Sequence, residues 1–153
     1  MKLLTMKGPM CMVYSSAMAL GCDPQDICDY LGHNGMDEWW PEIPKPGCYR
    51  SFHIQEIITY AINVLQIGLV PIEVYPNSRP NATAKIKTVA SLEVLEERFI
   101  NLISGRIGIL IGENVFGQPH AVAWNEDICY DPVGQKYLLE KFTPRECWII
   151  SHL

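Results

Sequence analysis

The sequence predicts an α+β fold in which N-terminal helices pack on a C-terminal antiparallel sheet. Helix-type spacing of apolar residues dominates the first two thirds of the chain, and short β-rich segments separated by turn residues fill the last third. Helices followed by strands, without regular alternation, are typical of α+β proteins. The 153 residues, 48% of them hydrophobic, suffice for one domain with a buried core, so we expect a single domain over residues 1–153.

Turn and capping residues mark the first two helices. Gly8-Pro9 prevents a helix from extending backwards, so the first helix is predicted at Cys11–Leu20, with Gly21 as its terminator. Small residues within this helix would let other elements pack closely on it. The second helix has capping signals at both ends, namely Asp23, Pro24 and Gly32.

Two further amphipathic segments follow. In His53–Gln66 the apolar residues recur at helical spacing along one face, and Ser51 is the expected N-cap. Ser91 is expected to cap a helix that reaches about Ser104. The inward-facing residues of that helix are predicted to be Leu92, Leu95, Phe99, Leu102 and Ile103.

The predicted strands are short and bounded by turn formers. Pro71 restricts the first of them, Leu69–Tyr75, to a sheet edge or a bulge. In the C-terminal half we expect four more strands in an antiparallel meander: Ile107–Gly112, Ala121–Trp124, Ile128–Tyr130 and Cys147–Ser151. Residues 33–51, by contrast, are rich in turn formers and predict a long loop, a kind of segment that often serves as a lid or a binding loop.

Charge and hydropathy argue against two classes of partner. The formal charge is −5, with 17 acidic and 12 basic residues, and no cluster of lysine or arginine indicates a nucleic-acid surface. No segment has the length of a membrane-spanning helix, and the N-terminal residues lack the continuous apolar stretch of a signal peptide. We therefore expect no nucleic-acid partner, no membrane span and a cytoplasmic location.

Six cysteines raise the alternatives of disulfides, a metal site or a reactive thiol: Cys11, Cys22, Cys28, Cys48, Cys129 and Cys147. Without a secretion signal, reduced thiols are the default. No Cys-x-x-Cys pair is present, and the pairs Cys28/His33 and Cys48/His53 have a five-residue step that is not a known zinc pattern. The sequence thus predicts no metal and no cofactor, and most of these cysteines are expected to be packing residues.

Cys11 lies where a thiol can be activated. A helix N-terminus lowers the pKa of a thiol because its unpaired N–H groups stabilise the thiolate. Cys11 is predicted to open the first helix, directly after the Gly-Pro break. For a lone cysteine, simple packing on a buried helix would be the better interpretation. Residues at the far end of the chain favour the first interpretation.

His120 and Asp131 are the other groups that an activated cysteine needs. His120 opens a predicted strand, a turn follows at residues 125–127, and the partner strand ends in Asp131-Pro132. In a hairpin of this length the histidine and the aspartate fall near each other at the open end. The carboxylate would then orient the imidazole while the other ring nitrogen faces a thiolate, which is the arrangement of a nucleophile, its base and an orienting group.

With these residues the chain resembles the papain-like cysteine peptidases. It is most similar to the bacteriocin-processing peptidases, which remove double-glycine leaders, and to related compact proteins of bacteria and phages. The resemblance spans nearly the whole chain but rests on three short runs: Gly8-Pro9-Met10-Cys11, His120-Ala121-Val122-Ala123 and Tyr130-Asp131-Pro132. It implies a papain-like fold and thiol hydrolase chemistry, with Cys11 as nucleophile, His120 as base and Asp131 as the orienting residue. It also implies a peptide or protein substrate and, for a phage-encoded chain, the host cytoplasm.

Two positions depart from the family pattern. Members usually have a glutamine about six residues before the nucleophile, where its side chain completes the oxyanion hole, and here that position is Thr5. Residue 12 is methionine where a glycine is common. The backbone N–H of Cys11 would supply one oxyanion donor. The candidates for the second donor are Thr5, Lys7, Gln55 and Gln118.

The loop and the helix start that follows it supply candidates for a substrate groove: His33, Trp39, Trp40, Arg50 and His53. Arg50 would offer an anchor for a carboxylate. The alternative is that these residues only pin the loop or cap the helix.

Three functions stay open at this point. The first is a cysteine hydrolase that cleaves a peptide or isopeptide bond. The second is a transglutaminase-like acyl transferase, in which an amine replaces water. The third is a non-catalytic binding module on the same fold, which the missing glutamine favours. Neither the cleavage specificity nor the oligomeric state follows from the sequence.

Overall fold

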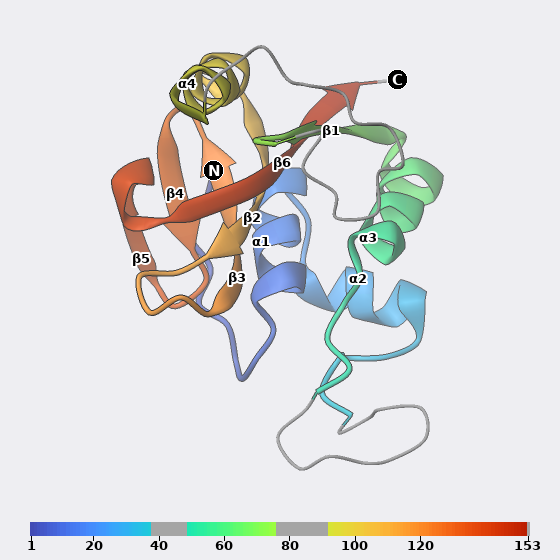
Figure 1. Ribbon diagram of the computed structural model, residues 1–153. Helices are drawn as coiled ribbons and strands as arrows, with labels where there is room; N and C mark the ends of the chain where they lie inside the picture. Colours follow the sequence, from blue (N-terminus) through green and yellow to red (C-terminus); the bar gives the residue numbers. More distant parts are fainter. Residues whose placement is uncertain (38–48, 76–91, 153) are drawn as a thin grey trace, which may run out of the picture.

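The computed structural model describes residues 1–37, 49–75 and 92–152, and these ranges contain helices on both sides of a sheet (Figure 1). The α+β arrangement with N-terminal helices and a C-terminal sheet is confirmed. Several sequence-based expectations fall outside the described residues: Trp39, Trp40, Cys48 and the Ser91 cap. None of the described helices is long and apolar enough to cross a membrane.

The first two helices have the predicted bounds. α1 spans Cys11–Leu20 and α2 spans Pro24–Leu31. Each is followed by a glycine in the left-handed conformation (φ 74°), which glycine adopts without steric cost. Asp23 caps α2 because its carboxylate accepts a hydrogen bond from the backbone N–H of Gln25 at 2.8 Å.

The third helical segment is not the continuous α-helix that the sequence predicts. α3 spans Ile54–Tyr60 and continues as a π-helical turn over Ala61–Leu65. A π-turn has i→i+5 bonds, so the residues within it rotate away from the α-helical stripe. Ile62, expected on the buried face, is accordingly 41% exposed.

The N-terminus of α3 is also capped differently from the prediction. Ser51 has a left-handed backbone (φ 56°) and lies three residues before the helix. The N-cap is His53, whose backbone N–H donates to the Glu56 carboxylate at 2.9 Å. A glutamate three residues after the cap is the sequence signal for this arrangement.

The strands form one sheet in the order β1-β6-β2-β3-β4-β5. Their bounds are Ile67–Glu73 (β1), Ile107–Glu113 (β2), Pro119–Asn125 (β3), Ile128–Asp131 (β4), Gln135–Leu138 (β5) and Thr143–His152 (β6). β2, β3 and β4 follow the predicted meander, and β5, which the sequence did not predict, extends it. The fourth predicted strand, β6, does not continue the meander but returns to pair with β2 and β1. β1 lies at an edge of the sheet, as Pro71 requires.

Helices cover both faces of the sheet. α1 packs on β2, β3 and β4, with α2 and α3 against it, while α4 (Leu92–Ile103) contributes to the core on the opposite face. Alternate residues of β3 divide between the two cores, since Ala123 faces α1 and Val122 and Trp124 face α4. The sheet is therefore the middle layer.

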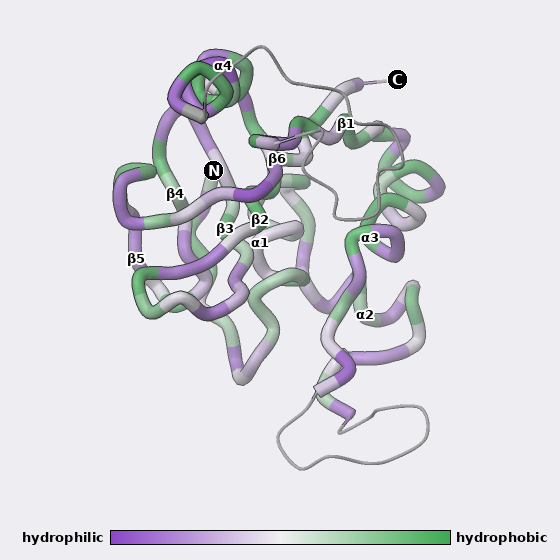
Figure 2. The backbone as a smooth tube through the Cα atoms, in the orientation of Figure 1, coloured by the Kyte–Doolittle hydropathy of each residue, from purple (hydrophilic) through white to green (hydrophobic). Residues whose placement is uncertain are grey.

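α4 buries a narrower face than the sequence predicts. Leu95, Phe99 and Ile103 are buried at i, i+4 and i+8, as expected of the line that contacts the sheet. Leu102, predicted to face inward, is 42% exposed because it lies one position off that line. Hydrophobic and hydrophilic segments alternate around the turns of α4 in Figure 2, as in any helix with one buried face.

Candidate active site

The start of α1 reaches the sheet at the point where β3 and β4 separate. These two strands pair over only three residues each, Ala123–Asn125 with Ile128–Tyr130. Beyond that stretch, Ala121 directs its backbone groups to α1. Its carbonyl accepts from the hydroxyl of the fully buried Ser15 at 2.8 Å, and its N–H donates to the sulfur of Cys11. α1 thus occupies the place that a longer β4 would fill.

The structure brings together Cys11, His120 and Asp131 at this junction. Nε2 of His120 lies 2.9 Å from Oδ1 of Asp131, and the imidazole also hydrogen-bonds to the Cys11 sulfur. Because Nε2 is engaged by the carboxylate, Nδ1 is the nitrogen that is left to face the sulfur. Extending the β3–β4 register places Asp131 opposite Val122, so His120 is its diagonal neighbour on the same face of the sheet.

Asp131 is held by three donors. Oδ1 accepts from His120 and from the backbone N–H of Val133 (3.0 Å), and Oδ2 accepts from the Tyr137 hydroxyl (2.5 Å). The residue is only 4% exposed. Burial raises the pKa of its carboxyl, but the hydrogen bonds from His120, Tyr137 and Val133 outweigh burial and lower the pKa below its usual value. The carboxylate therefore stays ionised in a site shielded from water.

The pKa of Cys11 is lowered and that of His120 is raised, so each group favours its charged form. Burial raises the pKa of Cys11, but the hydrogen bond and the charge of His120 lower it. The N–H groups of Ala121 and Met12 lower it further, and the resulting pKa lies below the ordinary value. Burial lowers the pKa of His120, but the hydrogen bonds to Asp131 and Cys11 raise it to about 9. Both shifts favour a thiolate paired with an imidazolium.

The remaining described cysteines have no such partners. All five described cysteines are unbridged thiols. Burial raises the pKa of Cys129 to about 12 and also raises that of Cys147, since both lie in the apolar core on the α4 side. Burial is likewise the largest cause of the raised pKa of Cys22 and Cys28. Within the described part of the chain, a lowered thiol pKa is found at Cys11 alone.

Two of the oxyanion candidates, Thr5 and Lys7, line one cavity. Thr5 and Lys7 belong to the segment that precedes α1, and Thr5 forms a β-bridge with Val133, beside the turn that holds Asp131. Both residues line a cavity of about 500 Å³, together with Met10, the residue immediately before the nucleophile. Cys11 and His120 themselves do not line this cavity.

The two glutamines are placed differently. Gln118 lies in the β2–β3 hairpin, two residues before His120, and its side-chain oxygen accepts from the Asn114 amide at 3.4 Å. Gln55 is exposed on the first turn of α3. Gln118 is thus the closer of the two to the imidazole along the chain, but its side chain already has a partner in the hairpin.

His33 and Arg50 belong to a network at the base of the loop. The Glu56 carboxylate lies 3.0 Å from Nε2 of His33 and accepts from Arg50 at 2.9 Å, and Arg50 also contacts the His33 ring. His33 stacks on Phe52 with a centroid separation of 4.5 Å. Arg50 therefore already has a carboxylate partner within the protein. His53 caps α3, as described above.

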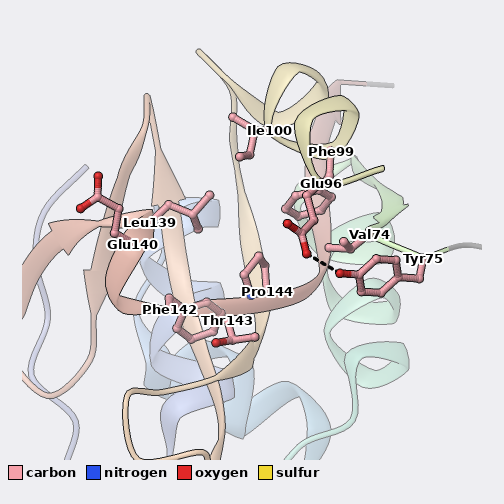
Figure 3. A pocket seen from close by; sticks show the side chains of 10 residues that line it. All are labelled: Val74, Tyr75, Glu96, Phe99, Ile100, Leu139, Glu140, Phe142, Thr143 and Pro144. Atoms are coloured by element: carbon pink, nitrogen blue, oxygen red, sulfur yellow. Dashed lines mark hydrogen bonds between the residues drawn. The ribbon is translucent and has the colours of Figure 1, made fainter. Parts of the chain in front are cut away.

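A second cavity lies on the α4 side of the sheet. It has a volume of about 320 Å³ and lies between α4 and the start of β6, with the Tyr75–Glu96 hydrogen bond at one side (Figure 3). Phe142 lines it, and the Phe142 and His120 rings have a centroid separation of 6.4 Å. Gly112 permits this approach, because a Cβ there would lie 2.9 Å from the Phe142 ring. One aromatic ring thus separates the imidazole from the cavity.

Sequence reasoning missed Tyr137 and Phe142. Tyr137 lies on β5, a short strand with three exposed residues out of four, which has no clear hydrophobic alternation. Phe142 follows the 3-10 turn Leu139–Lys141, in a segment that carries no helix or strand signal. No group of three or more His, Cys, Asp or Glu side chains among the described residues could hold a metal ion.

Comparisons of the chain with family models, with curated proteins and with solved structures found no match.

Proposed function

We propose that this chain is a cysteine hydrolase of the papain-like type, which cleaves a peptide or isopeptide bond with Cys11, His120 and Asp131. The observation that carries the proposal is the hydrogen-bonded series from the Cys11 sulfur through the imidazole to a buried, ionised carboxylate. Such a series supplies a nucleophile, a proton carrier and an orienting group.

The proposed reaction begins with attack of the Cys11 thiolate on the carbonyl carbon. A C–S bond forms, the carbonyl π electrons move to oxygen, and the backbone N–H of Cys11 at the start of α1 donates to the resulting oxyanion. Thr5 or Lys7 is the proposed second donor, because both belong to the segment that directly precedes the nucleophile. Collapse of this intermediate breaks the C–N bond, and the leaving amine takes the proton from Nδ1 of His120.

Hydrolysis of the thioester restores the site. Neutral His120 accepts a proton from water, the hydroxide oxygen bonds to the acyl carbon, and the C–S bond breaks to regenerate the thiolate beside an imidazolium. Asp131 keeps Nε2–H engaged throughout, so that Nδ1 always faces the sulfur. An amine in place of water at this step gives acyl transfer on the same residues, and a primary-amine acceptor in the assay separates the two reactions by the conjugate that only the transferase forms.

The lowered pKa of Cys11 favours catalysis over a non-catalytic binding module. The experiment is a brief treatment of the native chain with an iodoacetamide-based probe near pH 6, followed by peptide mapping. Cys11 should be modified well ahead of the other five thiols, and Cys11→Ala should abolish both this labelling and hydrolysis of a peptide library. Cys22→Ala, which removes another partly exposed thiol, should leave both unchanged. Labelling spread evenly over the accessible thiols would contradict the proposal.

A further inference from the structure

Asp131 lies between two diagonal neighbours, one on each adjacent strand. β5 pairs with β4 so that Tyr137 is opposite Cys129, two residues before Asp131. Residues opposite each other or two apart share a face of the sheet, so Tyr137 lies on the same face as Asp131. His120 approaches the carboxylate from β3 and Tyr137 approaches it from β5 (the strands labelled in Figure 1).

These two neighbours contact different oxygens of the Asp131 carboxylate. Oδ1 accepts from His120 and from the N–H of Val133, whereas Oδ2 accepts from the Tyr137 hydroxyl at 2.5 Å. An ionised oxygen without a donor in a shielded site is costly, and the torsion that turns a carboxylate is soft. Removing the hydroxyl would therefore let the carboxylate rotate, which moves Oδ1 from Nε2 of His120, or take up a proton, which removes the charge that holds the imidazolium.

We propose that Tyr137 is a positioning residue of this site, whose hydroxyl fixes the Asp131 carboxylate with Oδ1 aimed at His120. The role rests on the proposed function and extends it, since Tyr137 acts on Cys11 only through Asp131 and His120. Burial and the adjacent Asp131 raise the pKa of Tyr137, so the hydroxyl keeps its proton over the whole range in which the thiolate works.

Tyr137 also packs at the border of the core on the α4 side, so the effect of its hydroxyl must be measured separately from the effect of its ring. Tyr137→Phe keeps the ring and removes only the donor. Tyr130→Phe is the matched control, because Tyr130 is a buried tyrosine of the adjacent strand that contributes to the core on the α1 side, and its cation–π contact with Lys136 needs only the ring.

The measurement is the pH dependence of Cys11 alkylation by iodoacetamide, with the thermal unfolding midpoint recorded for each variant. Tyr137→Phe should move the inflection for Cys11 to higher pH, because a less well oriented carboxylate holds the imidazolium less firmly. Each unit of that shift lowers the alkylation rate below the inflection about tenfold. Tyr130→Phe should leave the inflection in place. In the Asp131→Asn background, Tyr137→Phe should have no further effect, because Tyr137 acts through the carboxylate.

Three results would overturn the role. An unchanged inflection with a lowered unfolding midpoint would make Tyr137 structural only. A shift to lower pH would mean that the hydroxyl competes with His120 for the carboxylate. Additive effects of the two substitutions would mean that Tyr137 acts by another route. The proposed function fails separately, if the native chain itself shows no Cys11 inflection below that of an ordinary thiol.

Discussion

Cys11 and Cys129 are both shielded thiols near Asp131, yet their pKa values are displaced in opposite directions. Burial and the direct charge of Asp131 raise the pKa of Cys129 to about 12. The same carboxylate favours the thiolate of Cys11, because the His120 imidazolium lies between them and carries a positive charge that faces the sulfur. A nearby carboxylate thus suppresses or supports a thiolate according to whether a proton carrier separates the two.

The largest effect is expected from loss of His120, which should also remove the difference in pKa direction between Cys11 and Cys129. His120→Ala should reduce hydrolysis roughly 10³-fold, within the range that general acid–base groups contribute. The Cys11 inflection should then rise, because burial raises its pKa without opposition from the imidazolium. Steady-state kinetics and the pH dependence of alkylation check both expectations. Activity within about threefold of the native chain would show that His120 is not the base.

Neutralising the orienting carboxylate should have a smaller effect. Asp131→Asn keeps the shape but removes the charge that raises the pKa of His120 to about 9, so that pKa should fall. The imidazolium should then be lost at a lower pH, and hydrolysis should decrease roughly 10²-fold. Titration of the His120 ring proton by NMR gives the pKa directly. A His120 pKa unchanged in the variant would contradict the assigned role of Asp131.

Much of the candidate site could be predicted from short-range signals in the sequence. Gly8-Pro9 before Cys11 defined the start of α1, and the turn at residues 125–127 set the hairpin that brings His120 to Asp131. Both relations depend on a few consecutive residues, for which turn and capping rules are strong. The meeting of the thiol with the imidazole was inferred from the groups that an activated cysteine needs and from the resemblance, because no local pattern fixes it.

The features that sequence reasoning missed depend on long-range packing. Tyr137 reaches Asp131 only because β5 pairs with β4, and the polar composition of β5 gives no sign of that pairing. The return of β6 to the far side of β2 is likewise determined by tertiary packing and not by a local sequence pattern. The π-turn after α3 shows a third limit, since an α-helical spacing of apolar residues over His53–Gln66 does not exclude a local change of helix type.

The contact that joins α1 to β3 should affect stability more than chemistry. The fully buried Ser15 hydroxyl donates to the Ala121 carbonyl, next to the N–H that contacts the Cys11 sulfur. Ser15→Ala would leave that carbonyl without this donor, and we expect a loss of about 1–3 kcal/mol in the free energy of unfolding. Urea denaturation measures the loss. Ser16→Ala is the control, because its hydroxyl bonds within α1 to Met12, so a larger loss there would contradict this account of how α1 is anchored.

The smallest effect is expected at Cys129, the thiol whose pKa is raised. Cys129→Ala removes one buried sulfur from the core on the α4 side and should cost about 1 kcal/mol through the cavity that it leaves. The alkylation rate and the inflection of Cys11 should stay unchanged, because the sulfur–imidazole–carboxylate series does not include Cys129. A shift of the Cys11 inflection in this variant would show that the two thiols are coupled in a way that the contacts do not explain.

The thiolate–imidazolium pair itself is most directly tested by ultraviolet difference titration. Thiolate absorbance near 240 nm is recorded against pH for the native chain and for Cys11→Ala, and the difference between the curves is the titration of Cys11 alone. A thiolate already formed well below the ordinary thiol value of about 8.5 is the expected result. A difference curve with its midpoint at or above that value would mean that Cys11 is an ordinary buried thiol.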